Sequence, residues 1–398
     1  MDSGGAASLQ QMQDAALPLF FTGDEYMNTQ WYSEELWHRV FPAIGNRTAW
    51  SVVAGPKESD PAVRENLHKP YSKRLMEHMQ PWLTYGEDGS NPELIRYWAE
   101  RGIRKEIHSC SENPDRTWVA YLPEHAVQLG LSCPIWFINH AKGRDLLDIE
   151  CWGFVQLVAE KQIIVLTVEE GNSDEIVWQT ILEAARQYPV DLSRVYMVGH
   201  SFSGSVSGRI VIANPERYAG VCMLGSQYSG LDSTKEQIAN AMRYRMPRID
   251  VHGTAEKILP FNQTSGIPAS PRIVDNVTPT DMGAEACYAE QCLWHKLNCC
   301  EMVEWQDAAN IQQTSGDIVE QKIGTILQNT RVRVLGMVPH YIGDVLDHEG
   351  FALIRHIGVE GAPHYPSAYC AELAWEFLHG FSRDTQTGEL LWYNHKTR

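Results

Sequence analysis

The chain has 398 residues, of which 43% are hydrophobic and 21% are charged, and its formal net charge is −17 at pH 7. This length is sufficient for one large folded domain with additions, and the composition is that of a globular protein. The negative charge argues against nucleic acid or an anionic membrane as a partner, because both bind basic patches. The sequence has no run of about eighteen apolar residues, so we expect no membrane span.

The N-terminal residues lack the basic segment and the apolar stretch typical of a signal peptide. We therefore expect a cytoplasmic protein whose nine cysteines are reduced. One cluster has the composition of a zinc site: Cys287, Cys292, Cys299 and Cys300, with His295 between them. Its spacing differs from that of paired zinc knuckles, which favours ordinary thiols. We expect neither a metal nor an organic cofactor.

Residues 1–95 differ in pattern from the rest of the chain. The segments Asp24–Val40 and Leu67–Trp82 have the apolar spacing of amphipathic helices, the second interrupted near Pro70. We expect an N-terminal helical extension that packs on or caps a main domain at 96–398. An alternative interpretation is that it mediates homo-oligomerisation.

From about residue 100, apolar strands alternate with helices. The predicted strands are Ile103–His108, Trp118–Leu122, Pro134–His140, Gln162–Val168, Arg194–Val198, Gly220–Leu224, Pro247–His252, Val332–Met337 and Ala352–Val359. The predicted helices are Leu146–Glu160, Asp174–Gln187, the segment after Ser201 to about Ala213, Glu285–Leu297 and Ala368–Leu378. This alternation predicts an α/β fold with a mostly parallel, doubly wound sheet and an antiparallel pair of strands at one edge.

The segment RVYMVGHSFSG, residues 194–204, places Ser201 between an apolar strand and a helix. This layout is typical of a nucleophile elbow, a strained turn that exposes a serine hydroxyl. The sequence departs from G-x-S-x-G at Ser203, which stands in place of the last glycine. A serine nucleophile needs a base, a carboxylate that orients the base, and donors for the oxyanion.

Glu256 is the candidate carboxylate, because it follows the strand that ends at His252 and lies in a Gly-Thr turn. The alternative interpretation is a solvated loop glutamate. Asp232 and Asp250 are rival candidates, but Asp250 lies within a predicted strand and Asp232 follows a different one.

His364 is the candidate base, because it lies in a Gly/Pro loop between the last predicted strand and the final helix. Of its rivals, His356 lies inside that strand, whereas His340 and His348 precede it.

The oxyanion donors are expected to be backbone N–H groups. One is that of Phe202, directly after the nucleophile at the start of a helix. The other is that of Ala141 or Lys142, in the loop after PIWFINH. Lys142 is alternatively a solvated residue or one that attracts an anionic substrate.

Four segments in chain order carry a resemblance to a known family: YLPEHAVQLGLSCPIWFINHAKG, DLSRVYMVGHSFSG, VHGTAEKILP and VEGAPHYP. From about Trp118 to Asp384 the chain resembles the α/β-hydrolase esterases of the polyhydroxybutyrate depolymerase and feruloyl esterase type. The resemblance implies an α/β-hydrolase fold. It also implies site roles: Ser201 as nucleophile, Glu256 as acid, His364 as base, and Phe202 with Ala141 or Lys142 in the oxyanion hole.

The chain departs from that family at four places. Ser203 replaces the elbow glycine, and Glu256 replaces the usual aspartate. His140 is followed by Ala141 instead of glycine, and Tyr365 stands where the family often has tryptophan. These departures predict a divergent branch with its own substrate.

We therefore predict a serine hydrolase that cleaves a carboxylic ester, small or oligomeric, by way of an acyl-enzyme. Two alternatives remain: a peptidase or amidase with the same machinery, and a non-catalytic binding protein on a hydrolase scaffold. The segment 266–330 is predicted to be a lid or substrate-binding insertion, or else a peripheral addition with the helix Glu285–Leu297 packed on the sheet.

Overall fold

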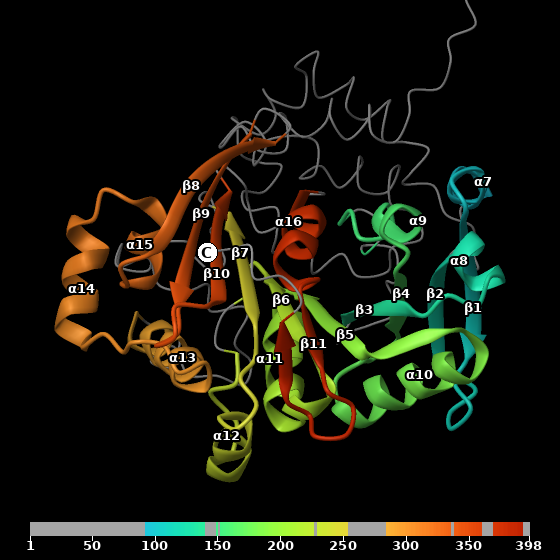
Figure 1. Cartoon of the computed structure of the whole chain (residues 1–398), viewed down its shortest axis with the longest axis horizontal. Helices are drawn as coiled ribbons and strands as arrows, with labels where there is room; N and C mark the ends of the chain where they lie inside the picture. Colours follow the sequence, from blue (N-terminus) through green and yellow to red (C-terminus); the bar gives the residue numbers. More distant parts are fainter. Residues whose placement is uncertain are drawn as a thin grey trace, which may run out of the picture.

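The structure, a computed structural model, describes residues 92–139, 149, 152–226, 229–253, 284–335, 338–359 and 369–392. The predicted helices Asp24–Val40 and Leu67–Trp82 lie outside the described residues. The centre of the described part is a ten-stranded sheet with the order β1-β2-β4-β3-β5-β6-β7-β10-β9-β8, crossed by helices on both faces (Figure 1). The fold is therefore α/β, as the sequence predicts.

The strands of this sheet are β1 (Ile103–Ser109), β2 (Thr117–Pro123), β3 (Cys133–Asn139), β4 (Ile164–Val168), β5 (Val190–His200), β6 (Gly220–Leu224), β7 (Arg248–Gly253), β8 (Gln328–Leu335), β9 (Val338–Leu346) and β10 (Ala352–Val359). The run β4-β3-β5-β6-β7-β10 is parallel. At one edge β1 and β2 are antiparallel, as predicted. At the other edge β9 and β8 are antiparallel to their neighbours.

The central strands are buried on both faces, so successive side chains enter two separate cores. On β5, for example, Val195 and Met197 join the core on one face, whereas Tyr196 and Val198 join the other. This pattern explains why these strands read as continuous apolar runs in the sequence.

Helices cover both faces of the sheet. One face packs against α7 (Pro92–Glu100), α9 (Leu157–Lys161) and α16 (Tyr369–Leu378). The other packs against α10 (Asp174–Gln187), α11 (Phe202–Ala213), α12 (Lys235–Ala241), α13 (Ala284–Leu297) and α15 (Ile318–Ile323). In Figure 1, α10, α11 and α13 lie toward the bottom of the view, and α9 and α16 lie toward the top. The remaining elements are α8 (Glu124–Gln128), α14 (Trp305–Thr314), a 3-10 turn (Pro215–Arg217) and the hairpin β11 (Phe381–Arg383) and β12 (Leu390–Trp392).

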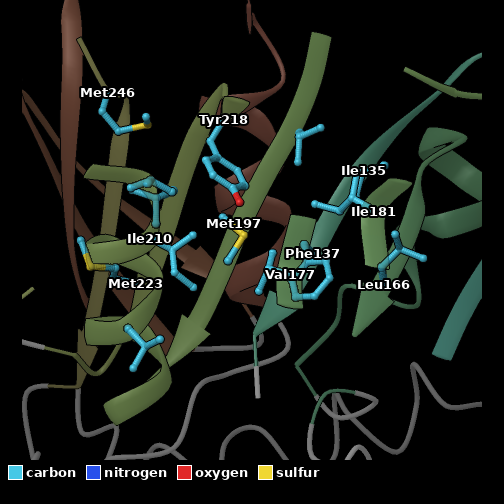
Figure 2. Close-up of a cluster of buried hydrophobic side chains, with 14 of the residues drawn as sticks. Ile135, Phe137, Leu166, Val177, Ile181, Met197, Ile210, Tyr218, Met223 and Met246 are labelled. Atoms are coloured by element: carbon cyan, nitrogen blue, oxygen red, sulfur yellow. The ribbon is translucent and has the colours of Figure 1, made fainter. Parts of the chain in front are cut away.

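Figure 2 shows how the core under α10 and α11 is filled. Side chains from β3 and β5, such as Phe137 and Met197, meet Val177 and Ile181 of α10 and Ile210 of α11. This core anchors α11, and with it the turn that precedes the helix.

A strand and a helix are among the elements that differ from the sequence-based expectation. The strand β9 was not predicted, because Pro339 and Gly343 interrupt its apolar pattern; it pairs with both β8 and β10 and extends the sheet. The helix predicted at Leu146–Glu160 is shorter where the structure describes it, since α9 begins only at Leu157. Gly153, with a φ of 86°, breaks the helical course before that point.

The described part of the segment 266–330 contains α13, α14 and α15. Trp294 and Leu297 of α13, and Val319 and Ile323 of α15, are buried in the core shared with α10 and α11. Residues 266–283 lie outside the described residues, so a lid in this segment stays a prediction.

Candidate active site

Ser201 lies between the end of β5 and the start of α11, and its backbone has φ 54° and ψ −125°. This conformation is strained for a residue with a side chain, at a cost of roughly 1–3 kcal/mol. Hydrogen bonds on both sides hold it in place. The Ser201 N–H donates to Leu224 O at 2.9 Å, and the Ser201 carbonyl accepts from the amides of Gly204 and Ser205. The predicted nucleophile therefore occupies a sharp strand-to-helix turn.

The glycines around this turn explain why Ser203 is tolerated. A Cβ atom at Gly199 would lie 2.4 Å from Ser203 O, and one at Gly204 would lie 2.5 Å from the Ser226 Cβ. Both distances are too short for a side chain, so the close approach of strand and helix requires glycine at 199 and 204. Ser203 is partly exposed, and the tight packing at the helix start falls on its neighbour Gly204.

The start of α11 suits a developing negative charge. The first backbone N–H groups of a helix have no partner within the helix, and the helix dipole is positive at this end. The first turn of α11 contains no acidic residue that would neutralise it. The side chain of Phe202, directly after Ser201, is about half exposed. The predicted first oxyanion donor, the Phe202 amide, therefore belongs to a helix start that attracts anions.

The strands that lead to the other predicted site residues end at the same edge of the sheet as β5. Leu224 of β6 lies opposite His200 of β5 and also opposite Val251 of β7. On β10, Val359 lies opposite Gly253, the last residue of β7. Because the carboxyl ends of parallel strands share one edge of the sheet, the loops after β5, β7 and β10 start from the same edge.

Glu256, His364, Ala141 and Lys142 lie outside the described residues, so their roles stay predictions. Neighbouring strands are about 4.8 Å apart, so β10 lies about 14 Å from β5, with β6 and β7 between them. The chain from Val359 to His364 extends up to about 17 Å. A segment of this length can span the distance between the two strands, and the position of His364 stays a prediction.

The rival acids have other partners. Asp250 is buried within β7, where its Oδ2 lies 2.7 Å from Lys322 Nζ of α15 and 3.3 Å from His356 Nδ1 of β10. Burial alone would raise the pKa of the Asp250 carboxyl, but Lys322 and His356 outweigh burial and hold this pKa well below its usual value. Asp232 is exposed and pairs with Arg209 at 3.0 Å. Neither carboxylate lies at the carboxyl end of β7 or β10.

The rival histidines are also placed elsewhere. His356 is buried inside β10, and burial lowers the pKa of its imidazole to about 4. His340 is buried in β9, edge-to-face with the Tyr369 ring. His348 lies in the turn that precedes β10, at the opposite end of that strand from the site.

The cysteine-rich segment offers no metal centre in the part that the structure describes. His295 Nδ1 lies 2.8 Å from Glu301 O. Cys292, Cys299 and Cys300 form no disulfide. Among the described residues, no group of three or more His, Cys, Asp or Glu side chains is arranged to hold a metal ion.

Sequence reasoning missed a buried polar pair beside the turn. Asn139, the last residue of β3, donates from Nδ2 to Ser207 Oγ of α11 at 3.2 Å. Both residues are fully buried. The available signal was a polar residue that ends the apolar run PIWFIN, and a serine in the apolar part of α11.

The strand order, the parallel run and the strained serine after β5 together form the arrangement of an α/β-hydrolase fold. None of the helices that the structure describes is both long and apolar enough to cross a lipid bilayer.

Comparison with known proteins finds similarity at the level of structure. No protein-family model matches the sequence, and no curated protein matches it. Among solved structures, the chain is similar to an acetyl xylan esterase from Aspergillus awamori, at 10% identity and a TM-score of 0.43, over 69% of this chain and 98% of that one.

Two further solved structures are similar over a smaller part. An S-formylglutathione hydrolase from Agrobacterium tumefaciens matches at 15% identity and a TM-score of 0.33, over 43% of this chain and 81% of that one. A thermostable esterase matches at 13% identity and a TM-score of 0.32, over 42% of this chain and only 50% of that one. The assignment of the fold rests on the strand order and on the backbone at Ser201.

Proposed function

We propose that this protein is a serine hydrolase that cleaves carboxylic esters through an acyl-enzyme. The observation that carries the proposal is the backbone of Ser201, held at φ 54° at the head of α11. Strain of this kind lowers stability, and it occurs preferentially at functional sites. Here it presents a serine hydroxyl next to the amide groups that begin a helix.

In the acylation step, His364 accepts the proton of Ser201 Oγ while this oxygen attacks the ester carbonyl carbon. Glu256 orients the imidazole and stabilises its positive charge. When the tetrahedral intermediate collapses, the bond to the leaving oxygen breaks, and His364 gives its proton to that oxygen, which departs as the alcohol. Water then repeats the sequence on the acyl-enzyme and releases the carboxylic acid and Ser201.

The charge on the carbonyl oxygen is stabilised by backbone N–H groups in this mechanism. The Phe202 amide is one donor, and the amide of Ala141 or Lys142 is the other. The lack of an acidic residue in the first turn of α11 supports this role. Such donors act mainly on the transition state, because the negative charge exists only there and in the intermediate.

The direct test is labelling with a fluorophosphonate probe, read by intact mass and by peptide mapping. One adduct on Ser201, abolished in Ser201→Ala, is the expected result. The matched control is Ser203→Ala, which removes a hydroxyl two residues away and should keep both labelling and activity. A folded wild-type protein with no adduct, or with an adduct on another serine, would contradict the proposal.

Turnover of p-nitrophenyl esters gives a second measurement. Ser201→Ala should lower kcat by roughly four to six orders of magnitude while leaving the fold intact. Assay of matched ester and amide substrates separates an esterase from an amidase, since an amide has the poorer leaving group. A folded Ser201→Ala variant that keeps most of the activity would exclude Ser201 as the nucleophile.

A further inference from the structure

Asn139 connects the end of β3 to the first turns of α11. Its side chain is fully buried, and its backbone lies opposite Gly199, two residues before Ser201. Asn139 Nδ2 lies 3.2 Å from Ser207 Oγ, and Ser207 Oγ lies 2.8 Å from Ser203 O, with a longer contact of 3.4 Å to Val198 O. A continuous hydrogen-bonded path thus runs from β3 to the elbow.

The direction of each hydrogen bond along this path follows from how many hydrogen atoms the Ser207 hydroxyl carries. The Ser207 hydroxyl has a single hydrogen, and its nearest acceptor is the Ser203 carbonyl. Ser207 Oγ must therefore accept from Asn139, which places the amide NH2 of Asn139 toward α11. The other end of this amide, Oδ1, points toward Gly171 in the loop after β4.

The Asn139 side chain is confined at this second end. A Cβ atom at Gly171 would lie 2.8 Å from Asn139 Oδ1, so only glycine leaves room for the amide. Within the described part of the chain, Oδ1 accepts no hydrogen bond although it is buried. The amide is therefore held in one orientation between Gly171 and Ser207.

We infer that Asn139 and Ser207 are positioning residues that set the separation of the two oxyanion donors. This inference rests on the proposed function. The Phe202 amide begins α11, and the second donor, Ala141 or Lys142, follows Asn139 by two or three residues. Since each residue spans at most about 3.6 Å, anchoring Asn139 to α11 restricts where the second N–H group can lie relative to the first.

The expected effect is on the chemical step rather than on binding. Misplacing one donor weakens an interaction that forms fully only in the transition state, so Asn139→Ala and Ser207→Ala should lower kcat by about 10- to 100-fold and leave KM within about two-fold. The fluorophosphonate reaction gives the same information without an ester substrate. Its maximal rate of adduct formation should fall, whereas the probe concentration for half-maximal rate should not change.

Two matched controls separate positioning from general loss of stability. Asn298 is also a fully buried asparagine, which accepts from Met246 N and donates to Trp294 O near the amino end of β7. Thr180 of α10 is a buried hydroxyl that donates to the carbonyl four residues earlier, as Ser207 does. Asn298→Ala and Thr180→Ala should lower the unfolding midpoint but keep kcat within about two-fold of wild type.

Gly171→Ala displaces the amide instead of removing it. The added methyl group should push Asn139 away from Ser207, and kcat should fall as it does in Asn139→Ala. In the variant that combines Asn139→Ala with Ser207→Ala, the loss of kcat should be close to that of either single variant, because both interrupt one path. A double variant whose fold-loss of kcat equals the product of the two single losses would contradict a shared path.

The outcomes also separate this inference from the proposed function. This inference alone is overturned if the wild-type protein is labelled at Ser201 and the folded Asn139→Ala and Ser207→Ala variants react at the wild-type rate. Equal losses of kcat in the Asn298→Ala and Thr180→Ala controls overturn it as well. If Asn139→Ala does not fold, Ser207→Ala decides, since it removes one oxygen atom. A wild-type protein without an adduct at Ser201 overturns the proposed function and this inference with it.

Discussion

Asp250 of β7 and His356 of β10 lie directly opposite each other in neighbouring parallel strands, with Asp250 Oδ2 3.3 Å from His356 Nδ1. Lys322 of α15 approaches the same carboxylate at 2.7 Å. Nearby, Arg248 Nη2 lies 3.0 Å from Glu290 Oε1 of α13. Buried charges thus attach α13 and α15 to β7, the strand that precedes the predicted acid, and Asp250 links β7 to His356 of β10.

Lys322→Met should destabilise the protein strongly. It leaves the buried Asp250 carboxylate without its nearest cation, and loss of one partner of a buried ion pair costs about 3–5 kcal/mol. The free energy of unfolding in urea measures this effect. Arg209→Met removes one partner of the exposed pair with Asp232 and should cost at most about 1 kcal/mol. Equal effects of the two substitutions would show that burial does not control the strength of these pairs.

Stability should fall as the pH is lowered from about 6.5 to about 4. His356 stays neutral in the folded state down to a pKa of about 4, whereas in the unfolded chain it binds a proton near pH 6.5. The unfolded state therefore binds more protons in this window, and stability decreases toward acid by up to about 3 kcal/mol. Unfolding midpoints in urea at pH 7 and pH 4.5 measure the effect. His356→Gln should reduce the pH dependence, and a pH dependence that is unchanged in this variant would contradict the role of His356.

Replacing Arg383 with lysine should destabilise the fold. Its buried guanidinium donates to the carbonyls of Tyr218, Tyr244, Arg245 and Gly388, joining the β11–β12 hairpin to the loops beside β6 and β7. Burial lowers the pKa of this guanidinium to about 9.

A lysine ammonium cannot reproduce the geometry of these donors, so Arg383→Lys should lower the free energy of unfolding by about 2–4 kcal/mol. Thermal unfolding measures the change. Arg243→Lys, at an exposed position, is the control, and an equally small shift in both variants would count against a bonded role for the guanidinium.

The turn at Ser201 should require glycine at 204 but not at 203. Gly204→Ala places a methyl group 2.5 Å from Ser226 Cβ and should cost about 1–3 kcal/mol through overpacking, with loss of labelling at Ser201. Ser203→Gly restores the usual motif and should keep activity, with a small loss of stability from a flexible residue in the helix. Gain of stability in Gly204→Ala would refute the packing account.

Glu256→Gln and His364→Ala should lower kcat by at least about three orders of magnitude if these residues form the triad with Ser201. The fold should persist, since in the sequence both residues come after the strands β7 and β10 that build the sheet. His340→Gln and Asp250→Asn are the comparisons, because they change a buried histidine and a buried acid away from the proposed site. A larger loss of turnover in a folded comparison variant than in the loop variants would reassign the base or the acid.

Much of the fold was predictable because its signals are local. The helix Asp174–Gln187 is present with its predicted bounds, and Ser173 caps it by accepting from Ile176 N. The strands Gly220–Leu224 and Ala352–Val359 also agree residue for residue, since both are rich in apolar residues, with Arg355 and His356 as the polar exceptions in the second. The strand β9 gave no such signal, because a proline and a glycine interrupt its apolar pattern. It forms nevertheless, since it pairs with β8 on one side and β10 on the other.

The candidate site was less predictable from the sequence than the fold. Ser201 follows from a short motif, and the structure explains the departure at Ser203 through the contact of Gly204 with Ser226. The placement of Asp250 and His356 inside strands was visible in the sequence. Their mutual hydrogen bond and the pairing of Asp250 with Lys322 depend on packing between distant segments. For Asn139 the sequence shows only a polar residue at the end of an apolar run; its pairing with Ser207 depends on the packing of α11 against β3.

The backbone of Ser201 has a consequence for how this chain evolves. At φ 54° a glycine would relieve the strain, so selection for folding stability alone would replace the serine. Its presence means that the chain keeps a residue that weakens its own fold. Glycine at position 201 would therefore give a more relaxed backbone at the expense of the proposed nucleophile.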